Sequence, residues 1–404
     1  MSARLQVLVL TPSVPASWWG FGTRVLQLSR HLATRYDVSI LTYAWPSDAE
    51  DIDALRRQGM EVIPVLREDL TPMARRLGQV TSLLRRPPFG VLSLHDEAMQ
   101  AALDRVLAER LIDVVLIESS HICSFRLPER VTTVLDQHNI EYELLQRMQE
   151  GERSLPRRAF NRVEGYKCRR HERRAWTEVD AIAVTSDREA PIVRDRAGSA
   201  PVAVVPNAVD LDYFRPSGHS PTPGSMVFTG LLSYRPNLDA AHHFLDEVLP
   251  RVQARYPGAT MTIVGQGDER DLERMRRPGV VVTGRVPDIR PIVADAAVVV
   301  VPLRIGSGTR LKVVEAMAMG KAIVSTSLGH EGIDVEAGTH LLTADEPEAF
   351  AEATVSLLAD PARASELGRA ARSLAVQQYS WTSAGERLED LIERARSRSG
   401  VPTS

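Results

Sequence analysis

The sequence predicts an α/β fold made of two successive doubly wound domains, each with a parallel sheet between helices. Short apolar runs alternate with helical stretches along all 404 residues, which is the pattern of repeated strand–helix units. The runs are nearly continuous in apolar residues, as expected of strands that are covered on both faces of a parallel sheet. The pattern stops once, at a segment rich in proline and glycine, and then begins again, so we expect two domains.

The first domain is expected over residues 1–206. A helix with Val25, Leu28 and Leu32 on one face follows its first apolar run. The runs expected to form its strands lie at 5–10, 38–42, 113–117, 131–135, 180–185 and 202–205. A doubly wound sheet binds its ligand at the carboxyl ends of the strands, so candidate site residues are sought at these ends.

An interdomain linker is expected over residues 207–225. The prolines and glycines of PSGHSPTPGS (216–225) are incompatible with a helix or a central strand. The second domain is expected over 226–375, and its last elements lead into a C-terminal helical segment, 376–404, which fits against either domain and could return to the first. The strands expected in the second domain lie at 226–229, 260–264, 280–283, 297–301 and 321–325, with a helix from about 237 to 256.

The composition excludes several classes of protein. Apolar residues make up 44% and charged residues 25%, and the net charge of −3 gives no global reason to expect a nucleic-acid partner. The run at 5–10 lacks the flanks of a signal peptide, and no run approaches the length of a membrane-spanning helix. Cys123 and Cys168 form no metal-binding spacing and no disulfide framework, so we expect a cytoplasmic location.

Lysine is rare in this chain. Only Lys167, Lys312 and Lys321 are lysines among 49 basic residues. Compositional bias explains most of this preference for arginine. A lysine that is retained where arginine is the default indicates a position that needs a compact ammonium group.

Three motifs resemble phosphate- or metal-binding sequences but lack required residues. The Gly-Lys pair at 320–321 lacks the other residues of a P-loop. Two Gly-x-Gly sequences, at 20–22 and 265–267, lack the third glycine of a dinucleotide fingerprint. Asp210 and Asp212 form an Asp-x-Asp, for which we favour a role in a turn over metal binding.

Residues 301–326, VPLRIGSGTRLKVVEAMAMGKAIVST, carry the most informative motif. A buried strand ends at Pro302, a glycine-rich turn follows, and a helix begins near Thr309. The free N–H groups at such a helix start attract anions, yet Arg310 and Lys312 place two positive charges in the first turn. This arrangement is unfavourable unless an anion offsets it, and a diphosphate would do so.

Glu315 lies on the same helix among apolar residues. A carboxylate in such surroundings needs partners, and the two hydroxyls of a ribose would supply them. A pair with Lys312, three residues earlier on the same face, is an alternative of equal weight.

These motifs, in their order along nearly the whole chain, resemble the family 4 glycosyltransferases. The resemblance implies a GT-B fold, with two Rossmann-like domains facing a central cleft. In that family the glycine turn and the EAMA-containing helix bind the nucleotide-sugar donor, with the helical glutamate on the ribose. The matching glutamate here is Glu315.

Further segments match the family in sequence order: TIVGQGDER (262–270), VVVTGRVPDI (280–289), VVPNAVDLDYF (204–214), VLDQHNIEYE (134–143) and PSVPASWWGFGTR (12–24). By resemblance, His138 approaches the donor sugar, the N-terminal glycine loop faces the diphosphate, and Trp18 and Trp19 line an acceptor site or pack in the fold. The catalytic candidates are His138, Arg310 and Lys312. The donor-binding candidates are Gly20, Gly22, Arg235, Gly265, Arg285, Val286, Arg304, Ser307, Gly308, Thr309, Leu311 and Glu315.

Two positions depart from the family pattern. Ser307 stands where many members have a second glutamate near the transferred sugar, and Leu231 stands where many have an arginine. Arg235, Arg304, Arg310 and Lys312 are the candidates to neutralise the leaving diphosphate, and we favour Arg310 and Lys312 because of their position.

The resemblance implies transfer of a sugar from a nucleotide diphosphate donor to a glycan, lipid-linked or small-molecule acceptor, with retention of anomeric configuration and with no metal or cofactor. Two other functions stay open: a nucleotide-sugar 2-epimerase with the same fold, and a non-catalytic partner subunit that binds a nucleotide sugar. Ser307 and Leu231 give the last some weight.

Residues 147–174 hold ten basic residues against four glutamates. We favour a solvated helical face here. The alternative is peripheral contact with an anionic membrane, or with a phosphorylated lipid-linked acceptor, at the inner membrane face.

Overall fold

The computed structural model describes residues 4–17, 20–68, 71–150, 154–306 and 310–399. The chain forms two compact units. The N-terminal unit comprises Met1–Pro206 with Thr382–Ser404, and the C-terminal unit comprises Asn207–Trp381. No described helix combines the length and the apolar character needed to cross a membrane.

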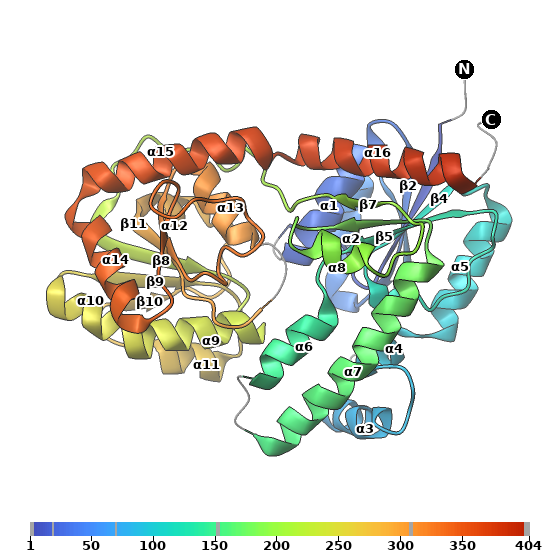
Figure 1. Cartoon of the computed structure of the whole chain (residues 1–404), viewed down its shortest axis with the longest axis horizontal. Helices are drawn as coiled ribbons and strands as arrows, with labels where there is room; N and C mark the ends of the chain where they lie inside the picture. Colours follow the sequence, from blue (N-terminus) through green and yellow to red (C-terminus); the bar gives the residue numbers. More distant parts are fainter. Residues whose placement is uncertain (1–3, 18–19, 69–70, 151–153, 307–309, 400–404) are drawn as a thin grey trace. The chain divides into compact units, whose positions relative to one another are not determined.

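The N-terminal unit contains a seven-stranded parallel sheet in the order β3-β2-β1-β4-β5-β6-β7 (Figure 1). Strand order reverses between β1 and β4, where Val7 pairs with Val114, and this reversal is the switch point of a doubly wound fold. Its strands are β1 Gln6–Thr11, β2 Asp37–Ala44, β3 Glu61–Leu66, β4 Val114–Ile117, β5 Thr132–Gln137, β6 Ala181–Val184 and β7 Val202–Val204. Its helices are α1 Gly20–Ala33, α2 Ala49–Arg57, α3 Pro72–Ser82, α4 Phe89–Leu94, α5 Glu97–Glu109, α6 Glu141–Glu150, α7 Leu155–Glu178, α8 Glu189–Arg194 and α16 Trp381–Ser399.

The C-terminal unit repeats the arrangement with a six-stranded parallel sheet in the order β10-β9-β8-β11-β12-β13. Its strands are β8 Thr222–Thr229, β9 Thr260–Val264, β10 Val280–Val282, β11 Ala296–Val301, β12 Ala322–Ser325 and β13 Leu342–Thr343. Its helices are α9 Arg235–His243, α10 Leu249–Arg255, α11 Glu269–Met275, α12 Arg290–Asp295, α13 Leu311–Ala318, α14 Pro347–Ala359 and α15 Pro361–Gln378. The predicted pair of doubly wound α/β domains is thus confirmed.

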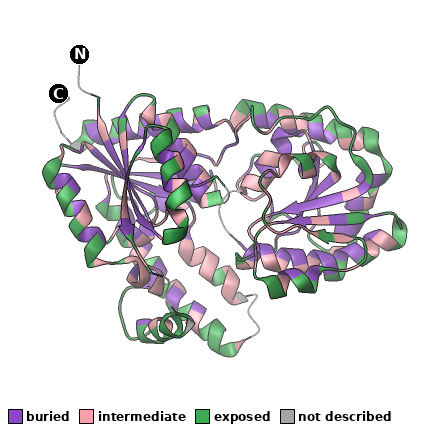
Figure 2. Cartoon of the chain, turned by 180° about the vertical axis from the view of Figure 1, so that it is seen from behind, coloured by how far each residue is buried: buried purple, intermediate pink, exposed green. Residues whose placement is uncertain are grey.

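The central strands are buried on both faces, while the helices expose their outer sides (Figure 2). β4 and β6 are buried at every residue, and β1 at all but its first. This is why the apolar runs in the sequence are continuous rather than alternating.

The structure differs from the predicted linker at its end. β8 begins at Thr222, inside the segment for which we expected no central strand. Its first residues tolerate Pro223 and Gly224 because the pairing with β11 is irregular there, and pairing with β9 begins only at Ser225. Gly224 has a φ of 78°, which favours glycine.

The helix expected at about 237 to 256 is continuous but not uniform. α9 and α10 are joined by a π-helical segment, Phe244–Val248, which ends one residue before α10. Pro250 lies at the start of α10 and has no N–H to donate. The π-helical segment accommodates this proline, so the helix continues from α9 to α10.

The last helix, α16, packs in the N-terminal unit from Thr382 onward. Glu389 lies 2.6 Å from Arg35 and 3.1 Å from His31, and the Tyr36 hydroxyl donates to Glu393 at 3.2 Å. At Gly385 a Cβ would lie 2.2 Å from the ring of His31, so glycine permits this close approach.

Candidate active site

The C-terminal unit brings four loops together at the carboxyl edge of its sheet. Gly230 follows β8, Gly265 follows β9, Gly284 lies just after β10 and Pro302 follows β11. The loops are joined by backbone hydrogen bonds from Gly230 N to Val264 O at 2.9 Å and from Gly265 N to Gly284 O at 3.0 Å. Most of the donor-binding candidates lie on or next to these loops, at the edge where a doubly wound sheet binds its ligand.

Two of these glycines allow contacts that no other residue would. A Cβ at Gly265 would lie 1.8 Å from the carbonyl oxygen of Gly230, so the two loops touch through their backbones. A Cβ at Gly230 would lie 2.7 Å from Nζ of Lys312. Gly230 therefore makes room for the ammonium group at the strand ends.

Lys312, in the first turn of α13, is half-buried and held in place by neutral groups. Its Nζ donates to Oδ1 of Asn237 at 2.7 Å and lies 4.2 Å from the centroid of the Phe228 ring. Burial, with the nearby charge of Arg310, lowers the pKa of Lys312 to about 7, although Glu315 opposes the shift. A second negative charge at this place would restore full protonation.

Glu315 is half-buried one turn further along α13 and lines a small cavity with Lys312. Burial raises the pKa of Glu315 to about 7, and Lys312 counteracts part of the shift. Among the described residues, the Glu315 carboxylate receives no hydrogen bond and forms no ion pair with Lys312 within 4 Å. The alternative of a Lys312–Glu315 pair is therefore not found, and the carboxylate lines the cavity without a hydrogen-bond donor among the described residues.

The start of α13 is positively charged. No acidic residue lies in its first turn, and its N-cap residue, Arg310, forms no side-chain cap. A Cβ at Gly306 would lie 2.9 Å from Nη2 of Arg310, so the guanidinium packs over this glycine, whose φ is 138°. Leu311 is half-buried at the first helical position, whereas Ser307, Gly308 and Thr309 lie outside the described residues.

The other candidates in this unit lie outside the first turn of α13. Arg304 is exposed and forms a two-bond pair with Asp239, at 2.8 and 3.1 Å. Arg235 is half-buried at the first position of α9, Arg285 is exposed, and Val286 packs on the core.

The Asp-x-Asp sequence has the turn role that we favoured. Oδ1 of Asp210 accepts hydrogen bonds from the backbone N–H groups of Asp212, at 3.1 Å, and of Tyr213, at 2.9 Å.

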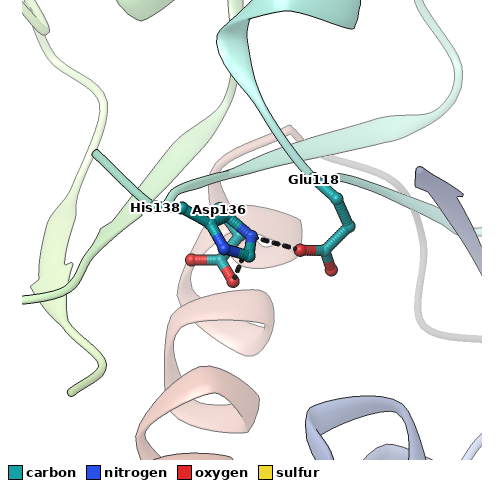
Figure 3. Close-up of side chains that lie close together, drawn as sticks. All are labelled: Glu118, Asp136 and His138. Carbon is teal, nitrogen blue, oxygen red and sulfur yellow. Dashed lines mark hydrogen bonds and ion pairs between the residues drawn. The ribbon is translucent and has the colours of Figure 1, made fainter. Parts of the chain in front are cut away.

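At the carboxyl edge of the N-terminal sheet, His138 belongs to a buried charge network. Arg24 of α1 donates two 2.8 Å hydrogen bonds to the Asp136 carboxylate near the end of β5. Nε2 of His138 lies 2.8 Å from Oε2 of Glu118, which follows β4, and 3.5 Å from Oδ2 of Asp136. Figure 3 shows the imidazole between the two carboxyl groups.

The network divides charge unequally between its two carboxyl groups. Burial alone would raise the pKa of Asp136, but the charges of Arg24 and His138 lower it below its usual value. Burial and the neighbouring Asp136 raise the pKa of Glu118 to about 7. One carboxyl group thus stays ionised while the other holds a proton up to neutral pH.

Glu118, Asp136 and His138 are also the one described group whose ligand atoms are close enough together to hold a metal ion. Arg24 already bonds both oxygens of Asp136, and its guanidinium supplies the positive charge that a metal would bring. The donor set therefore fits an internal ion network better than a metal centre.

The glycine loop contributes to the same place. α1 begins at Gly20, which is exposed, and Gly22 is buried in the first turn. The Phe21 ring between them stacks on His138, with ring centroids 4.4 Å apart and planes at 25°. Gly20 and Gly22 therefore flank the residue that covers the imidazole.

The chain around His138 is held from behind by α7. The buried Glu172 accepts hydrogen bonds from Gln137 Nε2 at 2.8 Å and from the backbone N–H groups of Glu141 and Tyr142, both at 3.0 Å. Trp176 Nε1 donates to Gln137 Oε1 at 3.2 Å. These bonds fix the segment on each side of His138, so its ring position follows from the packing of α7.

Sequence reasoning missed Arg24, Glu118, Asp136 and Asn237. A signal existed for two of them, because Glu118 and Asp136 are acidic residues at the carboxyl ends of runs that are otherwise apolar. Residues 136 and 138 also share one face of an extended chain. Nothing in the local sequence connects Arg24 with Asp136, which lies 112 residues away.

Family patterns match both halves of the chain. Residues 19–213 match the family described as Glycosyltransferase Family 4, and residues 223–360 match the family described as Glycosyl transferases group 1. The chain belongs to the family 4 glycosyltransferases. The suspected family is therefore confirmed, and the site lies in the part of the chain that these patterns cover.

Individual relatives of this chain are distant. It is 26% identical over 197 residues to a glycogen synthase of Mycobacterium tuberculosis, a match that covers 46% of each chain. It is also 26% identical over 247 residues to the GDP-mannose-dependent monoacylated alpha-(1-6)-phosphatidylinositol monomannoside mannosyltransferase of Corynebacterium glutamicum, covering 55% of this chain and 64% of that one. The matches thus span about half to two thirds of these relatives.

Solved structures share the fold over the full length. The sucrose-phosphate synthase of Thermosynechococcus elongatus has a TM-score of 0.74 and 18% identity, covering 98% of this chain and all of that one. Anabaena HepE in complex with UDP-glucose has a TM-score of 0.70 and 15% identity, covering 96% of this chain and 100% of that one. The GT-B fold expected from the resemblance is confirmed.

Proposed function

We propose that this glycosyltransferase moves a sugar from a nucleotide diphosphate sugar to an acceptor hydroxyl, with retention of configuration and with no metal ion or cofactor. The observation that carries the proposal is the pair of half-buried opposite charges on α13. Lys312 and Glu315 line one small cavity beside α13, yet form no ion pair within 4 Å there. Two such charges suit a ligand that offers an anion and hydroxyl donors together.

A nucleotide diphosphate sugar has both features. In the proposed complex the ribose hydroxyls donate to Glu315, and the diphosphate lies against the N–H groups of the first turn of α13. Arg310 and Lys312 supply the compensating positive charge. That Anabaena HepE holds UDP-glucose on the same fold supports a donor of this class.

The chemistry of the step follows from where charge develops. The bond between the sugar C1 and the diphosphate oxygen breaks, and a bond from C1 to the acceptor oxygen forms on the same face of the sugar. The acceptor proton passes to an oxygen of the departing phosphate. Because negative charge grows on the diphosphate, preorganised cations lower the barrier more than they strengthen donor binding.

We place His138 at the donor sugar or acceptor in this proposal. The imidazole is fixed by Glu118, Asp136 and the Phe21 ring, so it is rigid enough to orient a hydroxyl. The acceptor is a glycan, a lipid-linked sugar or a small molecule, and we propose a cytoplasmic protein with peripheral contact to anionic membranes.

A thermal-shift panel of UDP-, GDP-, dTDP- and ADP-sugars tests the proposal. A donor present at 100 times its Kd stabilises the folded protein by about 2.7 kcal/mol. We expect one donor class to raise the Tm of the wild type, and to do so much less in Glu315→Gln. If no nucleotide sugar moves the Tm, the proposed donor site is wrong.

Incubation with that donor then separates transfer from the two other functions. A transferase hydrolyses the donor slowly and consumes it quickly with an acceptor, whereas a 2-epimerase interconverts the sugar without an acceptor. A non-catalytic subunit shows the thermal shift but turns over no donor with any acceptor. Ser307 and Leu231, where many family members have a glutamate and an arginine, make this last comparison worth doing first.

A further inference from the structure

Helix α3 presents a row of exposed apolar side chains. Met73, Leu77 and Val80 are 80%, 63% and 63% exposed, and Leu84, just beyond the helix, is 91% exposed. Their spacing of four, three and four residues places them on one face. Single exposed apolar residues are ordinary on protein surfaces, but a continuous helical ridge is not.

The first half of α7 carries a second group of this kind. Leu155 is 76% exposed, Tyr166 is 71% exposed and Val163 is 42% exposed. The buried Glu164 on α7 bonds to the end of α3 through the Ser82 hydroxyl at 3.3 Å, and Lys167 Nζ donates to the Ser82 carbonyl at 2.9 Å. Both apolar groups thus belong to one region of the N-terminal unit, at the end of α7 that lies beside α3 (Figure 1).

The exposed charge of this region has one sign. Residues 72–86 contain four arginines and no acidic residue. Residues 155–170 contain a single acidic residue, Glu164, which is buried and paired with Lys167. The exposed arginines of the two segments are Arg75, Arg76, Arg85, Arg86, Arg157, Arg158, Arg162, Arg169 and Arg170.

We propose that the exposed side chains of 72–86 and 155–170, the α3–α7 face, dock on a membrane surface that carries anionic headgroups. An apolar ridge flanked by cationic side chains is the pattern of a helix that lies in the plane of a membrane interface. The ridge enters the acyl boundary, and the arginines contact lipid phosphates.

Charge argues for lipid over a second copy of this chain. A symmetric contact through the α3–α7 face would bring two sets of arginines together with no exposed acidic residue of the face to pair them. An anionic membrane offers the opposite charge and an apolar layer at the same place.

The α3–α7 face overlaps only in part with residues 147–174, for which peripheral membrane contact was predicted. The strongest apolar contribution comes from α3, which lies outside that stretch. Within the stretch, Glu164, Lys167 and Glu172 are buried, so one side of α7 packs on the fold and only the other side carries exposed arginines.

Co-sedimentation of the full chain with vesicles tests the proposal. Neutral phosphatidylcholine vesicles are compared with vesicles that contain one quarter phosphatidylglycerol, at low salt and at 0.5 M NaCl. Each arginine near an anionic surface contributes roughly fivefold to binding. We therefore expect the variant R75Q/R76Q/R85Q/R86Q, and separately L77S/V80S/L84S, to bind the anionic vesicles at least tenfold more weakly.

Matched controls come from the C-terminal unit. R274Q/R276Q removes exposed arginines, and V281S/V376S removes apolar side chains that are 58% and 48% exposed. Both controls should bind the anionic vesicles as the wild type does. Circular dichroism checks that each variant is folded, and the donor-induced thermal shift should be unchanged in every variant.

The outcomes separate the alternatives. Absence of wild-type binding to anionic vesicles, or equal loss in the control variants, overturns the proposal. Sedimentation equilibrium that shows a dimer in the wild type and a monomer in L77S/V80S/L84S, without vesicle binding, assigns the face to a second copy instead. A failed donor shift together with intact vesicle binding contradicts the proposed transfer and leaves the α3–α7 face in place.

Discussion

Both units have charged side chains at the carboxyl edge of their sheet, but the partners of these side chains differ. At the sheet edge of the N-terminal unit, the Arg24 guanidinium is bonded twice to Asp136, and His138 bridges toward Glu118. At the sheet edge of the C-terminal unit, Lys312 is held by a neutral amide and an aromatic ring. The first set of charges is paired internally, whereas Lys312 has no opposite charge within 4 Å among the described residues.

The pKa of Asp136 differs in the same way from those of the two charges on α13. In the N-terminal unit, partners keep Asp136 ionised despite burial. In the C-terminal unit, burial brings the pKa of Lys312 down to about 7 and that of Glu315 up to about 7. Binding of a diphosphate should therefore protonate Lys312 fully, and donor binding in the proposed complex should take up protons near pH 7.5.

The largest effect is expected from breaking the internally paired set. Arg24→Met leaves Asp136 ionised and buried beside Glu118, with its strongest partner removed. Breaking a buried ion pair by removing one partner costs about 3–5 kcal/mol. Urea denaturation followed by tryptophan fluorescence should show this loss, since Trp176 is fully buried in the same unit.

The matched control for Arg24 is a surface pair. Arg174 lies 2.7 Å from Glu178, but the two side chains are 76% and 51% exposed. Arg174→Met should change the free energy of unfolding by less than about 1 kcal/mol. If Arg24→Met is equally harmless, the network is not structural, and the contrast between the units is wrong.

The second effect concerns Lys312, which contacts the diphosphate in the proposed complex. Lys312→Met keeps the length of the side chain and removes its charge, so turnover should fall roughly 10²- to 10³-fold while donor affinity changes less. Initial rates over a range of donor concentrations separate kcat from KM. Unaltered turnover would remove Lys312 from the proposed mechanism.

Lys321→Met is the matched control, because Lys321 is a buried lysine of the same unit whose Nζ donates to the Ala294 carbonyl at 2.9 Å. It precedes β12, at the amino edge of the sheet, opposite to Lys312. The substitution should lower the Tm and leave kcat unchanged. Lys321 thus caps α12, rather than the end of α13 next to it in sequence.

The fold could be predicted because the strands of a parallel sheet are buried on both faces and are therefore continuous apolar runs in the sequence. Two edge strands were not predicted: β13 has only two residues, and Pro64 interrupts the apolar run of β3. Helix α3 escaped for a different reason: its apolar residues face solvent, so its pattern does not report a core.

The proximity of candidate site residues could be predicted where they lie close together in the sequence. The glycine turn, Arg310, Lys312 and Glu315 lie within ten residues on one loop and helix, so their common location follows from spacing. The Arg24–Asp136 contact and the position of Asn237 beside Lys312 depend on tertiary packing, and a single sequence contains no record of them.

The scarcity of lysine was more informative than expected. Lys167 is buried and bonds to the Ser82 carbonyl at 2.9 Å and to Glu164. All three lysines therefore place a compact ammonium group in a confined position, where the planar arginine fork would not fit the same partners.

The third effect concerns Glu315, whose replacement should weaken donor binding and stabilise the unliganded protein at high pH. Glu315→Gln removes charge-assisted hydrogen bonds to the ribose, which should weaken donor binding by about 1.5–3 kcal/mol. Because the pKa of Glu315 is raised in the folded state, its ionisation costs stability as the pH rises through about 7. The unliganded variant should therefore melt higher than the wild type at pH 8 but not at pH 5.

Calorimetric titration and thermal melts measure both parts of this effect. Glu352→Gln, on the surface of α14 and 64% exposed, is the control for the loss of one charge. A variant that binds donor normally would place the ribose elsewhere, whatever its stability.

The smallest expected effect comes from the proton that Glu118 holds in the N-terminal network. Glu118 has a pKa of about 7 in the folded protein and an ordinary value of 4.5, so the folded state keeps a proton that the unfolded chain releases. The stability from this group is fully present below pH 4.5 and is lost as the pH rises through about 7. Between pH 6 and pH 8 the loss amounts to about 1 kcal/mol.

Glu118→Gln isolates this loss, because glutamine mimics the neutral acid and does not titrate. The free energy of unfolding of the wild type should fall relative to the variant between pH 6 and pH 8. Glu172 and Glu315 titrate near the same range in both proteins, so the difference between the two curves reports Glu118 together with the groups that it contacts. If the free energies of unfolding of the two proteins change in parallel with pH, Glu118 is ionised throughout this range. The N-terminal network would then hold a buried charge that is not fully paired, as the C-terminal unit does at Lys312.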